Sequence, residues 1–127
     1  MTEATLGCTG PMFADTPEPP YTAVIFTSRR TAEDDDQYAL MAERMKQLAA
    51  NRRGYLGIES ARDPHDRFGI TVSYWASETD AKAWKQVAEH LEAQRLGMAR
   101  WYEGYEVRIA TVTRAYGHQT TEERGLP

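Results

Sequence analysis

The sequence FGITVSYWASETDAKAWKQVAEHL, residues 68–91, changes its hydrophobic period near the middle. Its first part, residues 68–75, is rich in β-branched and aromatic side chains and predicts a strand. Ser77 and Asp80 then have the spacing of a capping box, which starts a helix. The apolar residues beyond them recur on one helical stripe: Ala81, Trp84, Val87, Ala88 and Leu91. The stretch therefore predicts a strand that leads almost directly into an amphipathic helix.

The sequence on either side predicts three more strands and one more helix. A helix is expected to open at Thr31 and Asp34, which also have capping-box spacing, and to end near Gly54. The turn residues DPHD, 63–66, join the two strands around them into an antiparallel hairpin. Three further segments have the composition or the alternation of strands: residues 21–30 (YTAVIFTSRR), 55–62 (YLGIESAR) and 105–116 (YEVRIATVTRAY).

The order of these elements predicts the fold class. Strand, helix, strand, strand, helix, strand is the βαββαβ arrangement of ferredoxin-like domains, an α+β fold with a four-stranded antiparallel sheet. Both faces of the first strand are apolar, because Val24 and Phe26 alternate with Ala23 and Ile25. If helices cover one face of the sheet, we expect the other face to pack against a second copy, which predicts a homodimer.

Length, charge and composition limit the domain organisation and the partners. The 127 residues suffice for one domain at 21–117, between an extended or disordered arm at 1–20 and a flexible tail at 118–127. A net charge of −4 without a basic cluster argues against nucleic acid. Cys8 is the only cysteine, which excludes an intramolecular disulfide and favours the cytoplasm. No apolar run approaches the roughly 20 residues of a membrane-spanning helix, so no membrane association is expected.

Three segments together resemble the antibiotic biosynthesis monooxygenase family: AVIFTSRR (23–30), YWASETDAKAW (74–84) and EHLEAQRLGMARWYEGYEVRIATVTRAYG (89–117). The resemblance implies a dimeric α+β barrel built from two ferredoxin-like subunits. Members of this family range from cofactor-independent quinol and polyketide monooxygenases to haem-degrading enzymes. The resemblance therefore predicts the fold more narrowly than the activity.

The haem-degrading branch of the family fits this sequence poorly. Trp84 matches the tryptophan that those enzymes carry after the strand-to-helix junction. They also need an asparagine on the first strand, where this chain has Phe26 and Thr27, and an axial histidine whose place here falls near Gln94. His90 lies one helical turn earlier. Haem degradation is accordingly not the expected activity.

Cofactor-independent oxygenation of a quinol-like or polyketide-like aromatic is the leading functional hypothesis. The substrate must lose a proton before its anion can pass an electron to dioxygen, so the enzyme needs a base, an apolar cavity and a hydrogen-bond donor. His90 is the candidate base, because imidazole titrates near neutral pH. Trp84, Trp101 and Tyr102 would supply stacking surface, and a tyrosine hydroxyl or Arg95 would donate to the oxygen. The full set of candidates for binding the small aromatic substrate is Phe26, Tyr74, Trp84, Trp101, Tyr102 and Arg95.

No cofactor and no metal are expected. A glycine-rich dinucleotide fingerprint and a phosphate loop are both absent from the sequence. The metal-ligating side chains around Pro64 are read as a polar turn: Asp63, His65 and Asp66.

The candidate site residues also have structural interpretations. Trp84 shares the apolar stripe of its helix and fits a core position, and His90 fits a solvated surface position. Trp101 and Tyr102 are adjacent, so only one of them would face inward on a regular helix. The alternative function is therefore a non-catalytic module that binds a small ligand or serves in assembly.

Overall fold

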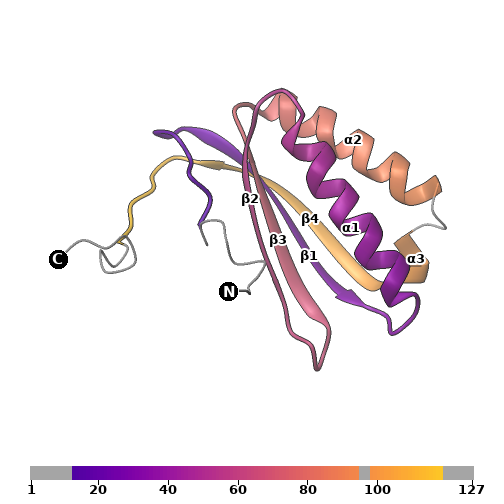
Figure 1. Ribbon diagram of the computed structural model, residues 1–127. Helices are drawn as coiled ribbons and strands as arrows, with labels where there is room; N and C mark the ends of the chain where they lie inside the picture. Colours follow the sequence, from indigo (N-terminus) through magenta and orange to yellow (C-terminus); the bar gives the residue numbers. More distant parts are fainter. Residues whose placement is uncertain (1–12, 95–97, 119–127) are drawn as a thin grey trace, which may run out of the picture.

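The computed structural model describes residues 13–94 and 98–118, and it has the predicted βαββαβ order (Figure 1). The four strands form one antiparallel sheet in the order β2-β3-β1-β4. The elements are β1 (Tyr21–Arg30), α1 (Asp35–Ala50), β2 (Tyr55–Arg62), β3 (Phe68–Trp75), α2 (Glu78–Gln94), α3 (Met98–Trp101) and β4 (Tyr102–Val112). The fold class deduced from the sequence is thus confirmed. Within the described residues, no helix is both long and apolar enough to span a membrane.

The two long helices begin in different ways. At α2 the predicted cap is present, because the Asp80 amide donates to Ser77 Oγ at 3.1 Å and the Ser77 hydroxyl donates to the Asp80 carboxylate. At α1 the predicted capping box is wrong. The helix starts at Asp35, after Asp34 in a left-handed conformation that makes no side-chain cap, and the Thr31 hydroxyl instead donates to the carbonyl of Arg100. Thr31 is therefore used to attach α3 rather than to start α1.

The last strand is shifted from its predicted limits of 105–116. β4 begins at Tyr102, which pairs with Arg30 beyond a bulge at Glu103 of β4, and it ends at Val112 opposite Tyr21. The strand stops there because its partner stops. Residues 19 and 20 before Tyr21 are prolines, which have no amide hydrogen to donate to a sheet.

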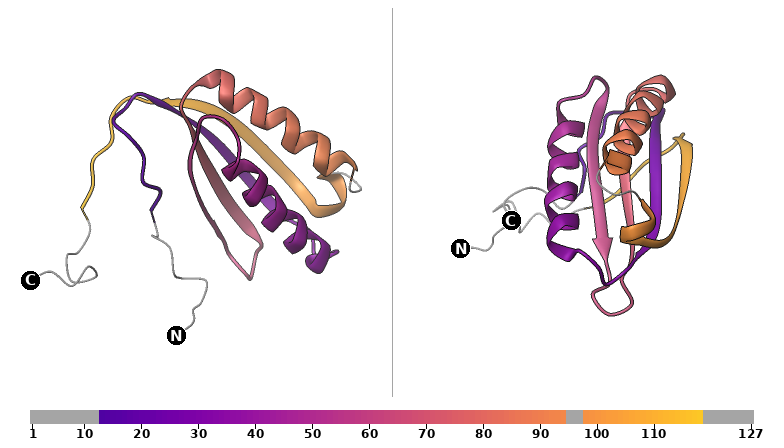
Figure 2. Two further views of the ribbon diagram at one scale, coloured as in Figure 1. Left: turned by 45° about the horizontal axis from the view of Figure 1, so that its top comes forward. Right: turned by 90° about the vertical axis from the view of Figure 1, so that its right-hand side faces the viewer.

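The helices α1 and α2 cover one face of the sheet, as Figure 2 shows from the end of the molecule. This helix-covered face carries Val24 and Trp75, which pack against Ala49 of α1 and against Ala81 and Trp84 of α2. Trp75 is fully buried, and its indole nitrogen donates to Ser73 Oγ at 2.9 Å. The main core therefore lies between the sheet and the two helices.

The opposite face of the sheet, here called the open face, is covered only at one end. Residues 13–20 lie there without regular secondary structure, and the Ala14 amide donates to Glu59 Oε2 at 2.8 Å. Tyr21 and Ala23 are buried, whereas Ile70 and Phe68 toward the hairpin are 41% and 44% exposed. The open face thus retains an apolar surface that no described residue of the same chain covers.

Candidate functional site

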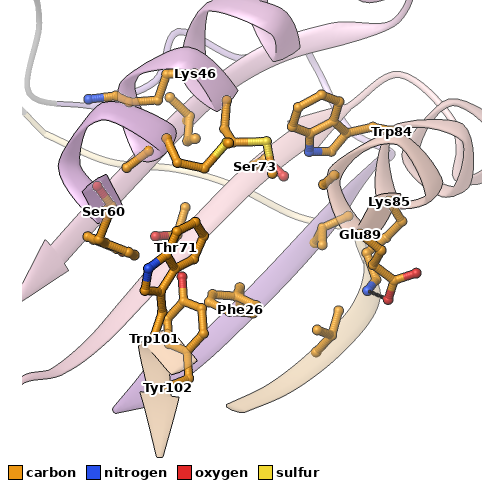
Figure 3. A pocket seen from close by; sticks show the side chains of 18 residues that line it. Phe26, Lys46, Ser60, Thr71, Ser73, Trp84, Lys85, Glu89, Trp101 and Tyr102 are labelled. Carbon is orange, nitrogen blue, oxygen red and sulfur yellow. Dashed lines mark hydrogen bonds and ion pairs between the residues drawn. The ribbon is translucent and has the colours of Figure 1, made fainter. Parts of the chain in front are cut away.

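A pocket with a volume of about 250 Å³ lies between the sheet and the helices (Figure 3). All four strands contribute to its floor, α1 and α2 form its sides, and Trp101 and Tyr102 close one end where α3 meets β4. Its lining is mainly apolar and aromatic. Because sites for drug-sized ligands usually measure about 300–1,000 Å³, this pocket suits one smaller molecule.

Trp101 and Tyr102 are both buried, at 2% and 6% exposure, although the sequence argument allowed only one of them to face inward. That expectation was wrong because the two residues are not on one regular helix: Trp101 ends α3 and Tyr102 begins β4. The break lets neighbouring side chains enter the same core. Tyr38 packs edge-on against both rings, at centroid distances of 6.0 and 5.9 Å, and Phe26 packs edge-on against Tyr102 at 5.3 Å.

Polar contacts with the junction between β1 and α1 hold this aromatic end in place. The Thr31 amide donates to the Trp101 carbonyl at 2.8 Å, and Arg100 forms an ion pair with Asp34 at 2.7 Å. Arg30 is only 4% exposed and places its guanidinium over the Tyr38 ring at 3.8 Å. The wall made by Tyr38 and Trp101 is therefore braced from outside the pocket.

Trp84 lines the opposite side of the pocket from Trp101 (Figure 3). Its ring stacks on Trp75 with 5.9 Å between centroids and an interplanar angle of 23°. Trp84 is 8% exposed, so it belongs to the core and to the pocket wall at once. The structural and the functional interpretations of this residue are both compatible with its position.

Few polar groups reach the pocket. The floor offers the hydroxyls of Ser60, Thr71 and Ser73, and the last of these accepts the hydrogen bond from Trp75. Lys85 and Glu89, one turn apart on α2, form an ion pair beside the pocket. Glu89 is the only carboxylate among the described lining residues.

The model of the antibiotic biosynthesis monooxygenase family matches residues 20–96, which is more than half of the chain. The chain belongs to this family. Among curated proteins, Bacillus subtilis YqjZ, whose function is uncharacterised, is 50% identical over 99 residues that cover 78% of this chain and 85% of YqjZ. Jasmonate monooxygenase ABM of Pyricularia oryzae is 28% identical over 92 residues, which cover 72% of this chain but only 43% of the fungal protein.

Solved structures of the family share the fold. SnoaB, a cofactor-independent oxygenase from Streptomyces nogalater, superposes with a TM-score of 0.61 at 11% sequence identity, over 77% of this chain and 98% of SnoaB. At that identity the likeness concerns the fold alone. It agrees with the ferredoxin-like sheet and helices of this member of the family.

The structure brings four of the predicted site residues together in the pocket, whereas Tyr74 and His90 are not among the described residues that line it. Phe26, Trp84, Trp101 and Tyr102 line it. Tyr74 lies on the open face, and Arg95 falls outside the described residues.

His90, the predicted base, is exposed on α2 and is not among the residues that line the pocket. The helical period explains this position. Lys85, Ala88 and Glu89 line the pocket with Trp84, whereas His90 is two residues beyond Ala88 and is rotated from it by about 200° around the helix axis. The geometry thus does not place His90 as the base for a molecule bound in the pocket.

The haem-degrading alternative requires an axial histidine, and no histidine is among the described residues that line the pocket. The turn with Asp63, His65 and Asp66 is closed by hydrogen bonds from the amides of His65 and Asp66 to Asp63 Oδ1. No group of three or more His, Cys, Asp or Glu side chains within the described ranges has the arrangement of a metal site.

Several lining residues were not singled out from the sequence as site residues. Tyr38, Met41 and Met45 recur at helical spacing within the first predicted helix, and such periodicity does not distinguish a pocket wall from a core. Ser60 and Thr71 did leave a signal. They are polar residues on the inward face of the predicted hairpin, where apolar residues are the rule.

Tyr74 has a strongly shifted acidity on the open face. Its ring packs edge-on against Tyr21, and its hydroxyl donates to Glu59 Oε1 at 2.8 Å. Burial, together with the hydrogen bond to Glu59 and its negative charge, raises the pKa of Tyr74 to about 12. Glu59 also holds the Ala14 amide, so this carboxylate joins the N-terminal segment to the open face.

This shift predicts a loss of stability at high pH. Between pH 10 and about 12 the folded protein retains a proton that the unfolded chain has released. The contribution of Tyr74 to the free energy of unfolding is therefore fully present below pH 10 and falls as the pH rises toward 12. Urea unfolding across this range should give a shallower decline for Tyr74→Phe than for wild type. Tyr116→Phe, at a residue that is 89% exposed, is the control, and equal slopes in all three proteins would contradict the assignment.

Proposed function

We propose that the protein is a cofactor-independent monooxygenase that oxidises a small quinol-like or polyketide-like aromatic molecule in the pocket. The observation that carries this proposal is the enclosure of about 250 Å³ by Phe26, Trp84, Trp101 and Tyr102, which offer ring surfaces from several sides. Membership in the monooxygenase family supports the reaction type. The pocket volume favours substrates with one or two rings, or a narrow part of a larger molecule.

In the proposed reaction the substrate itself supplies the electrons. Loss of a proton from an activated phenol or ring CH₂ group produces an electron-rich anion, which passes one electron to dioxygen. The resulting radical pair combines into a peroxide, and loss of water from the peroxide leaves a new carbonyl group on the ring. For a ring CH₂ group the balance is CH₂ + O₂ → C=O + H₂O. The apolar aromatic walls exclude bulk water around the anion.

Glu89 is the proton acceptor that the pocket geometry favours. It is the only carboxylate among the described lining residues, and its ion pair with Lys85 keeps a cation beside the site where the anion forms. His90 points to solvent from the same helix turn. We therefore assign the base to Glu89 and expect His90 to be dispensable.

Oxygen uptake by purified, metal-stripped protein tests this proposal against a panel of quinols and anthrone-like phenols. We expect both wild type and His90→Ala to take up oxygen faster than the buffer blank. The rates of the two proteins should agree within about twofold. Glu89→Gln should reduce the rate by about a hundredfold, since general base catalysis contributes roughly 10²–10⁴. Ala88→Phe, which places a ring in the pocket, should abolish uptake. Activity that falls in His90→Ala but not in Glu89→Gln would reverse the assignment of the base.

A non-catalytic ligand-binding protein is the second candidate. The pairing of Glu89 with Lys85 favours it, because this ion pair already engages the only carboxylate among the described lining residues. Binding of the same aromatic panel without any oxygen uptake would identify this function. Ala88→Phe should then weaken binding, as it would weaken catalysis in the enzyme.

We also propose that two copies form a homodimer through their open faces. The remaining apolar surface includes Ile70 and Phe68, both more than two-fifths exposed, beside the half-buried Ile25 and Val72. A charge introduced on this surface should prevent association, because the dimer interface would remove it from water without supplying an opposite charge.

Sedimentation analysis checks the dimer directly. Ile70→Asp is expected to raise the dimer dissociation constant by about a hundredfold or more. Ile109→Asp is a matched control, because Ile109 is 40% exposed against 41% for Ile70 but lies opposite Val24 on the helix-covered face. Equal effects of the two substitutions would exclude the open face as the interface.

A further inference from the structure

The indole nitrogen of Trp101 is a buried donor that has no hydrogen-bond partner in the described part of the chain. The residue is 2% exposed, and its Nε1 atom makes no hydrogen bond to any described residue. Buried tryptophan N–H groups usually have a partner, because an unpaired donor keeps the full penalty of desolvation. Trp101 also lines the pocket, so this donor belongs to a residue in the wall of a ligand-sized cavity.

The ring of Trp101 is held where it is. The backbone carbonyl of Trp101 accepts a hydrogen bond from the Thr31 amide at 2.8 Å, and the Tyr38 ring packs against the indole ring at an interplanar angle of 80°. Tyr38 is fixed in turn by the Arg30 guanidinium on its face. A reorientation that brought the indole N–H to bulk water would disrupt these contacts.

Two hydroxyl groups lie on the same side of the pocket. Ser60 and Thr71 are directly paired residues of the neighbouring strands β2 and β3, and both line the pocket. Figure 3 shows the nitrogen of the Trp101 ring on the side facing these two residues. Neither hydroxyl makes a hydrogen bond to another described residue.

We propose that Trp101, Thr71 and Ser60 form an oxygen-binding corner that fixes one carbonyl or phenolic oxygen of the ligand. The inference rests on the proposed function of the pocket as the ligand site. An indole N–H only donates, whereas a hydroxyl group can both donate and accept. The three groups together therefore suit a ligand oxygen that accepts a hydrogen bond from Trp101 and either accepts from or donates to the two hydroxyls. A hydrocarbon of the same shape would leave the Trp101 donor unpaired.

The corner determines how the ligand lies. Trp101 and Trp84 face each other across the pocket (Figure 3), so an oxygen bound beside Trp101 directs the rest of the ring system toward Trp84 and α2. The part of the ligand far from the bound oxygen then lies near Lys85 and Glu89. The corner is thus a positioning and specificity device and takes no part in proton transfer.

Binding of two probes of similar shape, 1-naphthol and 1-methylnaphthalene, tests the corner by calorimetry. Wild type should bind 1-naphthol at least about tenfold more tightly, which is the effect of one hydrogen bond to an otherwise unpaired buried donor. Thr71→Val removes a hydroxyl at constant shape and should reduce this preference to below about threefold, as should Trp101→Phe. Thr111→Val, at an exposed β4 residue outside the pocket, should retain the full preference.

Nuclear magnetic resonance of the indole protons provides a second readout that does not depend on protein stability. The Trp101 indole proton, assigned by its loss in Trp101→Phe, should shift downfield with 1-naphthol and not with 1-methylnaphthalene. Equal affinities for the two probes in wild type, or a downfield shift with both, would overturn the corner while the pocket remained a ligand site. If neither probe bound, both the corner and the proposed pocket function would be overturned. An active enzyme without any preference would reject the corner alone.

Discussion

Replacing Trp84 with alanine is expected to lower the free energy of unfolding by about 3–5 kcal/mol, the usual effect of removing a buried aromatic ring. The ring stacks on the fully buried Trp75 and packs against Val24 and Ala81, so its loss opens the core between the sheet and α2. For a domain with a total stability of about 5–15 kcal/mol, this is a large fraction.

The same substitution should also damage the ligand site. Without the ring, the new cavity joins the existing pocket, and a small aromatic ligand loses a contact surface. We expect its affinity to fall by about tenfold or more. Urea unfolding and calorimetry measure the two effects.

Two variants separate packing from general damage to α2. Trp84→Phe keeps an aromatic ring and should cost about 1–2 kcal/mol. Gln86→Ala, at an exposed position of the same helix, should stay within about 0.5 kcal/mol of wild type. A loss below about 1 kcal/mol for Trp84→Ala would mean that this side of the core is not packed as the structure has it.

Replacing Arg30 with alanine is expected to destabilise the protein by about 2–4 kcal/mol, because the substitution removes several contacts of a buried guanidinium at once. The guanidinium donates to Asp35 Oδ1 at 2.7 Å and to the Glu33 carbonyl at 2.9 Å, and it lies over the ring of Tyr38. Tyr38 supports Trp101, so the variant should also bind 1-naphthol more weakly than wild type.

Arg29 provides a matched control for Arg30. It is the preceding residue of β1 and carries the same side chain, but it is exposed whereas Arg30 is 4% exposed. Arg29→Ala should change stability by no more than about 0.5 kcal/mol. Urea unfolding of both variants gives the comparison, and similar losses at the two positions would refute the role assigned to the buried guanidinium.

The decrease in the free energy of unfolding at acid pH should depend on the contact between Arg30 and Asp35. The pKa of Asp35 lies below its usual 3.8, and the hydrogen bond from Arg30 is the largest cause. Desolvation acts in the opposite direction, whereas the hydrogen bond and the positive charge of Arg67 lower the pKa further. The contribution of this carboxylate is therefore present above pH 3.8 and is lost as the pH falls through the lower pKa of the folded state. In Arg30→Ala the part of this acid dependence due to Arg30 should disappear, while the part due to Arg67 remains.

The order of the elements and the start of α2 were readable from local sequence. The change from a strand pattern to a helical stripe around Ser77 is a short-range signal, and the cap it predicts is formed within four residues. Thr31 and Asp34 have the same spacing, but there the prediction failed. A long-range partner, the carbonyl of Arg100, takes the Thr31 hydroxyl, and sequence spacing carries no information about that contact.

The composition of the pocket depended on tertiary structure in a similar way. Aromatic residues at Phe26, Trp84, Trp101 and Tyr102 were recognisable as candidates, but the inward placement of both Trp101 and Tyr102 required the change from α3 to β4 between them. His90 was chosen for its chemistry, whereas its exposure depends on which face of α2 packs on the sheet.

The sequence by itself determined the βαββαβ fold and the supply of aromatic side chains, because hydrophobic period and capping act over a few neighbouring residues. Only the tertiary structure decided which side chains meet around the pocket, that the Trp101 donor has no partner among the described residues, and which hydroxyls lie near it. Those relations join residues that are far apart in the chain, such as Ser60, Thr71 and Trp101. They are set by strand register and helix packing, to which each residue contributes only a small part.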